Sequence, residues 1–377
     1  MWMPVTNAAT SSPRFERFIV EHVEQHRQHH FRVYAARLSC SYRVCILNTV
    51  TDKIMKAIVY ERYGSPDVLR LTEIPAPTPK ADEVLVKIHA VGLNAADWHL
   101  MRADPFLARM AAGLFKPKNN ILGEDIAGTV EAVGSAVTRF KPGDAVFACY
   151  QRGLAEYVCA PESKLTPKPA NLSFEEAAAV PMAALTALQG LRDHGKIQAG
   201  QRVLIHGASG GVGTFAIQLA KDFGAEVTAV TSTAKMNQAR ALGADHVIDY
   251  TREDFSRNGQ RYDLIFAANG NRKLSDYERA LTPTGIYVMA GGTTSQMFDA
   301  ILFGRFKTKK GGKTMKIFLA SSSPADLAII KDLIEAGKVK PMMDRCYPLA
   351  QTAEAMRYLE AGHAKGKIVV CVGEGGL

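Results

Sequence analysis

The sequence lacks the features that mark several classes of protein. No apolar run among its 377 residues approaches the roughly 20 residues that a membrane-spanning helix requires, so we expect no membrane span. The six cysteines are scattered and include no Cys-x-x-Cys pair. This argues against a disulfide framework or a cysteine-based structural zinc site, and it favours a reducing compartment. No basic stripe interleaved with aromatic residues accompanies the net charge of +9, so we expect no nucleic-acid partner.

The most informative feature that is present is a glycine-rich turn. An apolar run at 203–205 fits a buried strand, and residues 214–221 open a helix directly after the turn. A helix stop and a second apolar strand follow at 224–230, which completes a βαβ unit. A pyrophosphate must approach main-chain N–H groups at a helix N-terminus, where a Cβ would block it. We therefore predict a dinucleotide-binding turn, with a ligand-free tight turn as the alternative, made of Gly207, Ala208, Ser209, Gly210, Gly211, Val212 and Gly213.

The character of the chain changes along its length. Residues 1–54 are rich in histidine and arginine, and we expect an extension that is disordered or precedes a native start at Met55. Organelle targeting is the alternative, but Glu16, Glu21 and Glu24 argue against it, so we expect a cytoplasmic protein. Residues 55–179 show mostly strand patterns. From 180 on, strands and helices alternate, which implies a parallel sheet with helices on both faces.

Five motifs in a fixed order identify a family resemblance. They are Val-Gly-Leu-Asn at 91–94, Leu-Gly-Glu-Asp-Ile-Ala-Gly at 122–128, Phe-Lys-Pro-Gly-Asp at 140–144, Ala-Glu-Tyr-Val at 155–158 and Gly-Lys-Ile-Val-Val at 366–370. Together with the glycine turn, they make residues 55–377 resemble the medium-chain dehydrogenase/reductase superfamily. The resemblance is to its zinc-free quinone oxidoreductase-like (zeta-crystallin-like) branch.

The resemblance implies an α/β protein with two domains. A GroES-like β-rich catalytic domain would comprise residues 55–179 and 316–377. A Rossmann domain with a doubly wound parallel sheet would comprise residues 180–315. The nicotinamide would lie in the cleft between them, and the family resemblance also implies a homodimer or homotetramer.

Zinc-dependent relatives carry three metal ligands that this sequence replaces. Where those relatives have a cysteine after Val-Gly, a histidine in Gly-His-Glu and a later cysteine, this chain has Asn94, Glu124 and the cysteine-free segment 181–184. A catalytic zinc needs about three protein ligands of suitable type. We therefore expect no metal, and we expect a hydrogen-bond donor or water to polarise the substrate carbonyl.

The residues at the end of the second strand indicate the cofactor. An acid there would bind the ribose 2′-hydroxyl of NAD and repel a 2′-phosphate. Residues 231–235 contain hydroxyls and a lysine but no carboxylate, which favours NADPH over NADH. The resemblance places Lys235 and Tyr250 at phosphate contacts, with a plain surface lysine as the alternative. Asn269, Gly291 and Gly292 would face the nicotinamide or form ordinary sheet-end turns. The predicted contacts beyond the glycine turn are Thr231, Ser232, Lys235, Tyr250, Asn269, Gly291 and Gly292.

The segment 94–99 is the best candidate for the chemistry. Hydride passes directly from nicotinamide to carbon, so the protein supplies position, exclusion of water and stabilisation of charge. Asn94 could donate a hydrogen bond to substrate or cofactor. His99 stands where relatives often carry a substrate-facing tyrosine, its imidazole could donate the proton, and Asp97 could orient it. The alternatives are a packing role for His99 and a turn cap for Asp97, and solvent could supply the proton.

These patterns together predict a zinc-independent, NADPH-dependent oxidoreductase that transfers hydride to a quinone or other α,β-unsaturated carbonyl. The alternatives are a zinc-free alcohol or aldehyde oxidoreductase and a non-catalytic NADPH-binding sensor or structural protein. A short-chain dehydrogenase is excluded because no tyrosine has a lysine four residues later. The segment 100–118 could form an apolar wall for a hydrophobic substrate, or a core-facing helix, through Met101, Phe106, Leu107, Met110, Leu114 and Phe115.

Overall fold

Strands with buried apolar positions build a mostly antiparallel sheet from the two ends of the described chain. The structure is a computed structural model, and it describes residues 53–104, 106, 108–291 and 312–373. The sheet order is β14-β15-β3-β4-β5-β7, and β6 also pairs with β3. The strands are β3 (Glu83–Gly92), β4 (Asp125–Val133), β5 (Ala145–Cys149), β6 (Tyr157–Pro161), β7 (Thr166–Pro167), β14 (Met343–Pro348) and β15 (Lys367–Cys371). A separate two-stranded sheet joins β1 (Ile54–Val59) to β2 (Arg70–Pro75).

The second large sheet has six parallel strands in the order β10-β9-β8-β11-β12-β13. The strand order reverses between β8 and β11, and the carboxyl ends at such a point form a crevice where ligands bind. The strands are β8 (Arg202–His206), β9 (Glu226–Thr231), β10 (His246–Asp249), β11 (Tyr262–Ala267), β12 (Leu281–Met289) and β13 (Thr314–Ile317). This is the doubly wound arrangement that the alternating pattern predicted, and the α/β fold class is confirmed.

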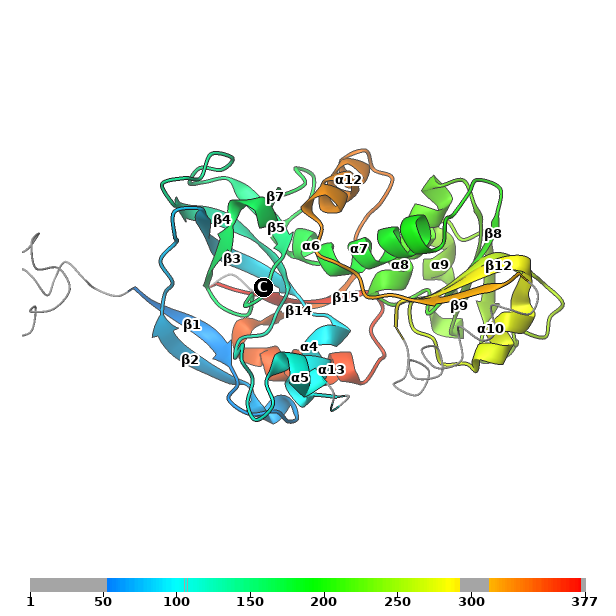
Figure 1. The fold of residues 1–377 in the computed structure, drawn as a ribbon, viewed down its shortest axis with the longest axis horizontal. Helices are drawn as coiled ribbons and strands as arrows, with labels where there is room; N and C mark the ends of the chain where they lie inside the picture. The colour runs from blue at the N-terminus through cyan, green and yellow to red at the C-terminus, as the bar shows by residue number, and fades with distance from the viewer. Residues whose placement is uncertain (1–52, 105, 107, 292–311, 374–377) are drawn as a thin grey trace, which may run out of the picture. The chain divides into compact units, whose positions relative to one another are not determined.

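Helices connect the two sheets and cover the parallel one. Figure 1 shows α6 and α7 between the two sheets, with α8 beside α7. The α-helices are α4 (Ala95–Arg102), α5 (Ala108–Ala112), α6 (Phe174–Ala178), α7 (Pro181–Gln189), α8 (Gly211–Asp222), α9 (Met236–Ala241), α10 (Leu274–Ala280), α12 (Pro324–Glu335) and α13 (Thr352–Glu360). A π-helical turn, η4 (Gly190–His194), extends α7, and short 3₁₀ turns are η2 (Pro66–Val68), η3 (Glu162–Lys164), η5 (Thr233–Lys235) and η6 (Leu349–Gln351).

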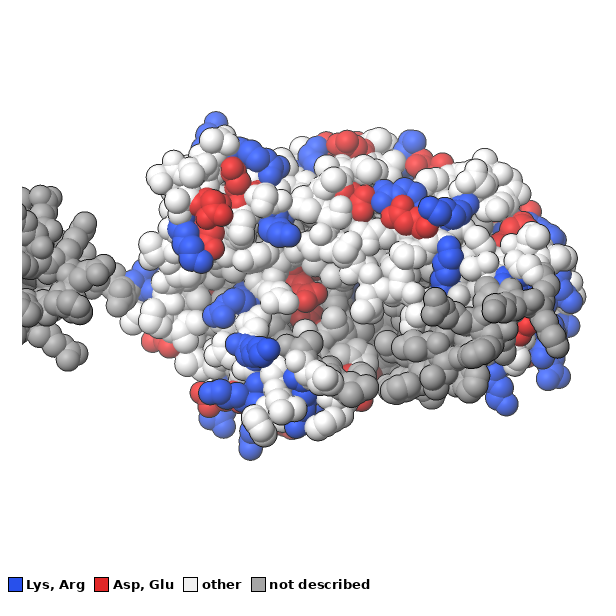
Figure 2. Space-filling view, in the orientation of Figure 1, with Lys and Arg blue, Asp and Glu red and all other residues white. Residues whose placement is uncertain are grey.

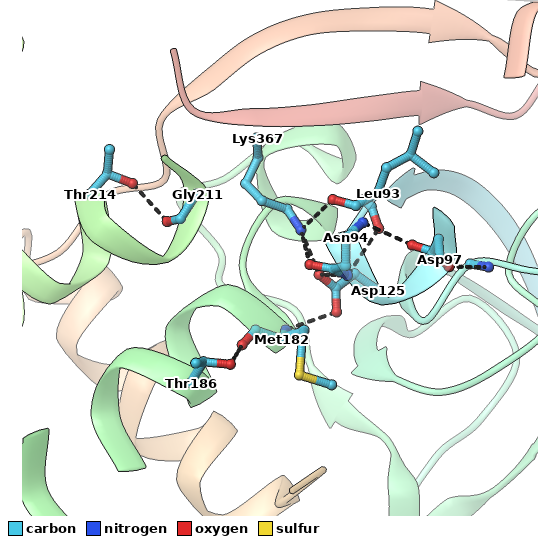
Figure 3. A network of polar contacts seen from close by, with 11 residues as sticks. Leu93, Asn94, Asp97, Asp125, Met182, Thr186, Gly211, Thr214 and Lys367 are labelled. Atoms are coloured by element: carbon cyan, nitrogen blue, oxygen red, sulfur yellow. Dashed lines mark hydrogen bonds and ion pairs between the residues drawn. The ribbon is translucent and has the colours of Figure 1, made fainter. Parts of the chain in front are cut away.

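The C-terminal residues return to the sheet of the first half. β15 pairs antiparallel with β3, so Val369 lies opposite Gly92 although the chain separates them widely. This pairing brings Lys367 to the region of α4, α7 and α8 (Figure 3). The parallel sheet extends to β13, so it runs two residues beyond the expected boundary at 315/316. The other expected domain boundaries stay predictions.

One disulfide corrects the interpretation of the cysteines. Cys346 and Cys371 are bonded, because β14 and β15 are parallel neighbours and bring residues 25 positions apart within reach. Cys149 and Cys159 are free. Scattered spacing argued against a disulfide framework, but it could not reveal a pair that forms only through strand pairing.

The predictions for the N-terminal extension and for a membrane span can be compared with the structure only within the described residues. The extension at 1–54 lies, except for its last two residues, outside them. Among the residues that the structure does describe, no helix has both the length and the apolar character needed to cross a membrane.

Candidate cofactor cleft and active site

The glycine turn joins β8 to α8 and leaves room on one side. Gly207 adopts a left-handed φ of +79°, and a Cβ there would stand 2.9 Å from the backbone nitrogen of Asn269. A Cβ at Gly213 would overlap the carbonyl oxygen of Gly207. These two glycines are therefore required by the close approach of backbone to backbone.

Gly210 is different, because the surrounding protein does not require it. The nearest atom to a Cβ at Gly210 would be the Gly207 carbonyl oxygen at 3.7 Å. Gly210 is also the N-cap of α8 and contributes no capping side chain, so the first N–H groups of the helix remain available. A free space in front of a helix N-terminus is a binding site for an anion. The turn therefore fits the pyrophosphate of a dinucleotide.

The glycine turn opens onto a cavity of about 720 Å³. Its wall includes Val212 from α8 and residues that directly follow β11 and β12, namely Ala268, Ala290 and Gly291. From segments next to the other sheet come Asn94, Ala95 and Ala96 at the start of α4, and Glu124 just before β4. Figure 2 shows that this face is hollowed near its centre, where acidic atoms lie among mostly uncharged ones. The structure thus brings Gly291 of the predicted nicotinamide end together with Asn94 of the predicted catalytic segment. Asn269 is not among the described residues that line this cavity, and Gly292 lies outside the described residues.

The predicted adenosine end is formed by separate strand ends. Thr231 is buried at the end of β9, and its hydroxyl has no hydrogen-bond partner among the described residues. The Lys235 ammonium donates to the carbonyl oxygen of Ala364 at 2.8 Å, and burial lowers the pKa of Lys235. Tyr250 is more than half exposed and lines a small cavity of about 160 Å³ with His206 and Arg272.

Strand pairing also brings a carboxylate to this end. Asp249 lies opposite Thr231 in the pairing of β10 with β9. Its oxygens accept hydrogen bonds from the hydroxyls of Thr233 and Thr251 and from the Thr251 backbone N–H, and the Thr233 bond holds the pKa of Asp249 below its usual range. Residues 231–235 do lack an acid, but the neighbouring strand supplies one that the sequence pattern missed.

A buried ion pair adjoins Asn94 beside the candidate active site (Figure 3). The Lys367 ammonium donates to Asp125 Oδ2 at 2.9 Å, to Asn94 Oδ1 at 2.6 Å and to the Leu93 carbonyl at 2.9 Å. The side chains of Lys367 and Asp125 are 4% and 0% exposed. The remaining oxygen of Asp125 accepts from the Met182 backbone N–H at 2.8 Å. Three donors on the lysine and both oxygens of the carboxylate are therefore engaged.

The same network holds the Asn94 side chain in one orientation. Its amide nitrogen donates to Asp125 at 2.9 Å while its oxygen accepts from Lys367. The amide that we expected to bind substrate or cofactor is thus engaged within the protein, and Asn94 lines the cavity in a fixed position. Sequence reasoning missed Lys367 and Asp125 as site residues. The available signal was a lone charge at the edge of each apolar strand, at 367–371 and 125–127.

Asp97 caps α4 and does not orient His99. Its two oxygens accept from the backbone N–H groups of Asn94 at 2.8 Å and Gly123 at 2.9 Å. Burial raises the pKa of Asp97 to about 6. The prediction that Asp97 orients His99 was therefore wrong, because a buried carboxylate at the third position of a helix satisfies its backbone first.

His99 lies apart from the two principal cavities. Its ring stacks on Trp98 with centroids 3.6 Å apart, and its Nδ1 is 2.6 Å from the carbonyl oxygen of Asp104. It is absent from the residues that line either cavity in the described part of the chain. The structure therefore brings Asn94 to the cleft but not the imidazole.

Glu124 lines two neighbouring cavities. A second cavity of about 360 Å³ shares Glu124, Gln151 and Arg152 with the larger one. Burial, together with the charges of Asp97 and Asp125, raises the pKa of Glu124 to about 7. In the sequence, this residue mattered only as a replacement for a zinc ligand. In the structure, it is an acid of the cleft that changes its protonation state near neutral pH.

The apolar wall predicted for 100–118 has a different composition. Leu100, Ala112 and Lys118 are the residues of this segment that line the smaller cavity. Met101 is fully buried in the core. Four other apolar side chains of this segment are exposed and line neither cavity. They are Phe106, Met110, Leu114 and Phe115.

A zinc ion would need ligands that these positions do not offer. Among the described residues, no group of three or more His, Cys, Asp or Glu side chains is arranged to hold a metal. The Asn94 oxygen already accepts from the Lys367 ammonium. A cation would therefore meet an existing positive charge at the position where zinc-dependent relatives carry a cysteine.

Comparisons with known proteins agree with this geometry. Residues 80–170 match the alcohol dehydrogenase GroES-like domain family, and residues 242–370 match the family described as zinc-binding dehydrogenase. The chain is 36% identical over 337 residues to an NADPH-dependent alkenal/one oxidoreductase, chloroplastic, of Arabidopsis thaliana, covering 84% of this chain and 80% of the relative. It is 34% identical over 376 residues to the NAD(P)H oxidoreductase RTN4IP1, mitochondrial, of Danio rerio, covering 89% and 96%.

A solved structure has the same fold. The quinone oxidoreductase from Coxiella burnetii superposes with a TM-score of 0.74 at 32% identity, covering 85% of this chain and all of that chain. The GroES-like and Rossmann-like parts inferred from the sequence are thereby confirmed as a fold.

Proposed function

The chain belongs to the medium-chain dehydrogenase/reductase superfamily and has quinone oxidoreductase-like relatives, and from this premise we propose a zinc-independent, NADPH-dependent reductase of quinones or other α,β-unsaturated carbonyls. The observation that carries the proposal is the open space at Gly210 in front of α8, two residues before Val212, which lines the cavity together with Glu124 and Gly291. A dinucleotide bound along this path would have its nicotinamide end beside a cavity large enough for a small-molecule acceptor.

The donor set supports zinc independence. Asn94 is a neutral amide engaged by Lys367, and among the described residues no group of three or more His, Cys, Asp or Glu side chains could hold a metal. Zinc in catalytic sites is held by about three protein ligands. The polarising group in this cleft would therefore be a hydrogen-bond donor of the protein.

The protein residues supply binding, orientation and exclusion of water. When bound, NADPH would supply the hydride. The α8 N-terminus would hold its pyrophosphate, and the apolar side chains of Val212, Ala268 and Ala290 would keep water from the reacting face. The ion pair of Lys367 and Asp125 would hold Asn94 and the start of α4 rigid beside the acceptor.

Oxidation of NADPH with a panel of quinones and enones, measured in EDTA, tests the proposal. We expect turnover that EDTA does not reduce, because no step requires a metal. Loss of activity in EDTA with recovery on addition of zinc would contradict zinc independence. Tight NADPH binding without turnover of any acceptor would favour a sensor or structural protein instead.

Lys235→Ala should reduce the preference for NADPH over NADH. The positive charge of Lys235 would face the 2′-phosphate, and a hydrogen bond that involves a charged group contributes about 1.5–3 kcal/mol, or roughly a 10- to 150-fold change in KM for NADPH. The KM for NADH should not change. Lys141→Ala, in a surface turn of the other sheet, is the control. An equal change for both cofactors, or no change for NADPH, would contradict a contact between Lys235 and the 2′-phosphate.

The cellular location and the oligomeric state both stay predictions. The relatives above are named as chloroplastic and mitochondrial, so a cytoplasmic location stays a prediction. The homodimer or homotetramer also stays a prediction, which size-exclusion chromatography with light scattering would test.

A further inference from the structure

We propose that Glu124, in its protonated form, donates its carboxyl hydrogen to the carbonyl oxygen of the acceptor during hydride transfer. The inference rests on the proposed function, because it needs a reducible carbonyl compound in the cleft. It assigns a chemical role to the position where zinc-dependent relatives carry a metal ligand.

The position of Glu124 carries the argument. It lines the 720 Å³ cavity together with Val212 and Gly291, which come from the dinucleotide-binding sheet. An acceptor between these residues would have the hydride donor on one side and the carboxyl group within reach. The backbone of Glu124 is held in place, since its carbonyl oxygen accepts a hydrogen bond from the Tyr150 N–H at 2.6 Å. Its carboxyl group also has a hydrogen bond with Gln151.

The other candidate donors are committed elsewhere. Both oxygens of Asp97 accept from backbone N–H groups, and the Asn94 amide donates to Asp125. His99 lines neither cavity. Burial raises the pKa of the Cys149 thiol far above neutrality, so it would not release a proton readily. Among the acids and phenols that line the larger cavity, Tyr150 is the remaining competitor.

The charges around Glu124 act in both directions. Burial makes the largest contribution and raises the pKa of Glu124, and the charges of Asp97 and Asp125 raise this pKa further. The Gln151 hydrogen bond and the charge of Lys367 lower it, and the resulting pKa is about 7. The carboxyl group is thus partly protonated at neutral pH and loses its proton as the pH rises. Activity should follow the protonated form and fall through about pH 7. The other titratable or charged groups that line the two cavities with it are Tyr60, Lys118, Cys149, Tyr150, Arg152 and Lys164.

The step balances without a further reactant. When bound, NADPH would supply the hydride for a C–H bond at the β-carbon of the acceptor, and the C=C electron pair would shift until the carbonyl oxygen carries negative charge. That oxygen takes the proton, so an O–H bond forms as the O–H bond of Glu124 breaks. The enol becomes the saturated ketone by tautomerisation, or a quinone becomes a quinol. The Glu124 carboxylate then regains a proton from water, and NADP⁺ leaves.

Glu124→Gln tests this role, because the amide keeps the shape of the side chain and cannot transfer a proton. We expect kcat with an enone to fall by about 10²- to 10⁴-fold, the range typical of general acid catalysis. The Kd of NADPH should not change. The decline of kcat through about pH 7 in the wild-type protein should disappear in the variant. Glu354→Gln, an exposed glutamate on α13, is the matched control, and Tyr150→Phe tests the competitor.

The outcomes separate this inference from the proposed function. Wild-type protein that binds NADPH but reduces no quinone or enone would overturn both. Wild-type turnover with a Glu124→Gln variant of unchanged kcat and pH profile would overturn only the role of Glu124. A large loss of kcat in Tyr150→Phe, with kcat unchanged in Glu124→Gln, would instead assign the proton to the phenol, whose pKa burial raises above its usual range. If Glu124→Gln does not fold, a wild-type kcat that is constant from pH 6 to 8 would still overturn the inference.

Discussion

Lys367→Met is expected to lower the free energy of unfolding by about 3–5 kcal/mol, the usual cost of leaving one partner of a buried ion pair alone. The substitution keeps the volume of the side chain but leaves Asp125 fully buried without its cation, and Asn94 without its donor. The same variant should lose most of its reductase activity, because the start of α4 is no longer held against the cleft. Urea denaturation and steady-state kinetics measure the two effects.

A matched control separates this effect from the loss of any lysine. Lys338 pairs with Asp222, but its side chain is 55% exposed, so Lys338→Met should cost less than about 1 kcal/mol. Replacing both Lys367 and Asp125 by Met and Leu should recover part of the loss, since two apolar groups leave no buried charge unpaired. A cost below 1 kcal/mol for Lys367→Met alone would show that water reaches Asp125 and that the pair does not organise the site.

Gly210→Ala is expected to weaken NADPH binding by at least about tenfold, or 1.4 kcal/mol, without a comparable loss of stability. The added Cβ meets no protein atom closer than 3.7 Å, and Gly210 has an extended backbone conformation that alanine adopts freely. Its methyl group would instead occupy the space in front of the α8 N-terminus. Fluorescence titration with NADPH and thermal unfolding of the free protein measure the two quantities.

Gly213→Ala provides the contrast within the same turn. Its Cβ would overlap the Gly207 carbonyl oxygen, so this variant should lose both stability and NADPH affinity. If Gly210→Ala binds NADPH as tightly as the wild-type protein, the pyrophosphate does not pass the turn on this side, and the proposed path of the cofactor is wrong.

The elements with strong local patterns were predictable from the sequence. The strand expected at 203–205 lies in β8 at Arg202–His206, and the second strand expected within 224–230 lies in β9 at Glu226–Thr231. The helix after the glycine turn begins three residues earlier than expected, at Gly211. Glycine is a poor helix former, so local propensity gave no reason to include these residues, but the first turn of a helix can hold glycine where a backbone or a ligand approaches closely.

The chemistry of the candidate site was much less predictable. Asp97 and His99 are close in sequence on one helix, and this proximity favoured a pair that the structure does not form. Asp97 turns to the backbone of Gly123, and His99 turns to Asp104. Residues two positions apart on a helix do not face each other, so once α4 begins at Ala95 these two side chains point to different partners.

The sequence by itself determined the βαβ unit, the glycine turn and the family, because each depends on residues that are neighbours along the chain. Only the tertiary structure decided the buried network beside the cleft, the pairing of two cysteines and the environment of Glu124. Lys367 meets Asn94 and Asp125 across 273 and 242 positions, and Cys346 meets Cys371 through the pairing of two strands. Glu124 becomes an acid with a raised pKa because burial and two other carboxylates surround it. Burial and pairing of charge depend on which surfaces pack together, and no local pattern encodes them.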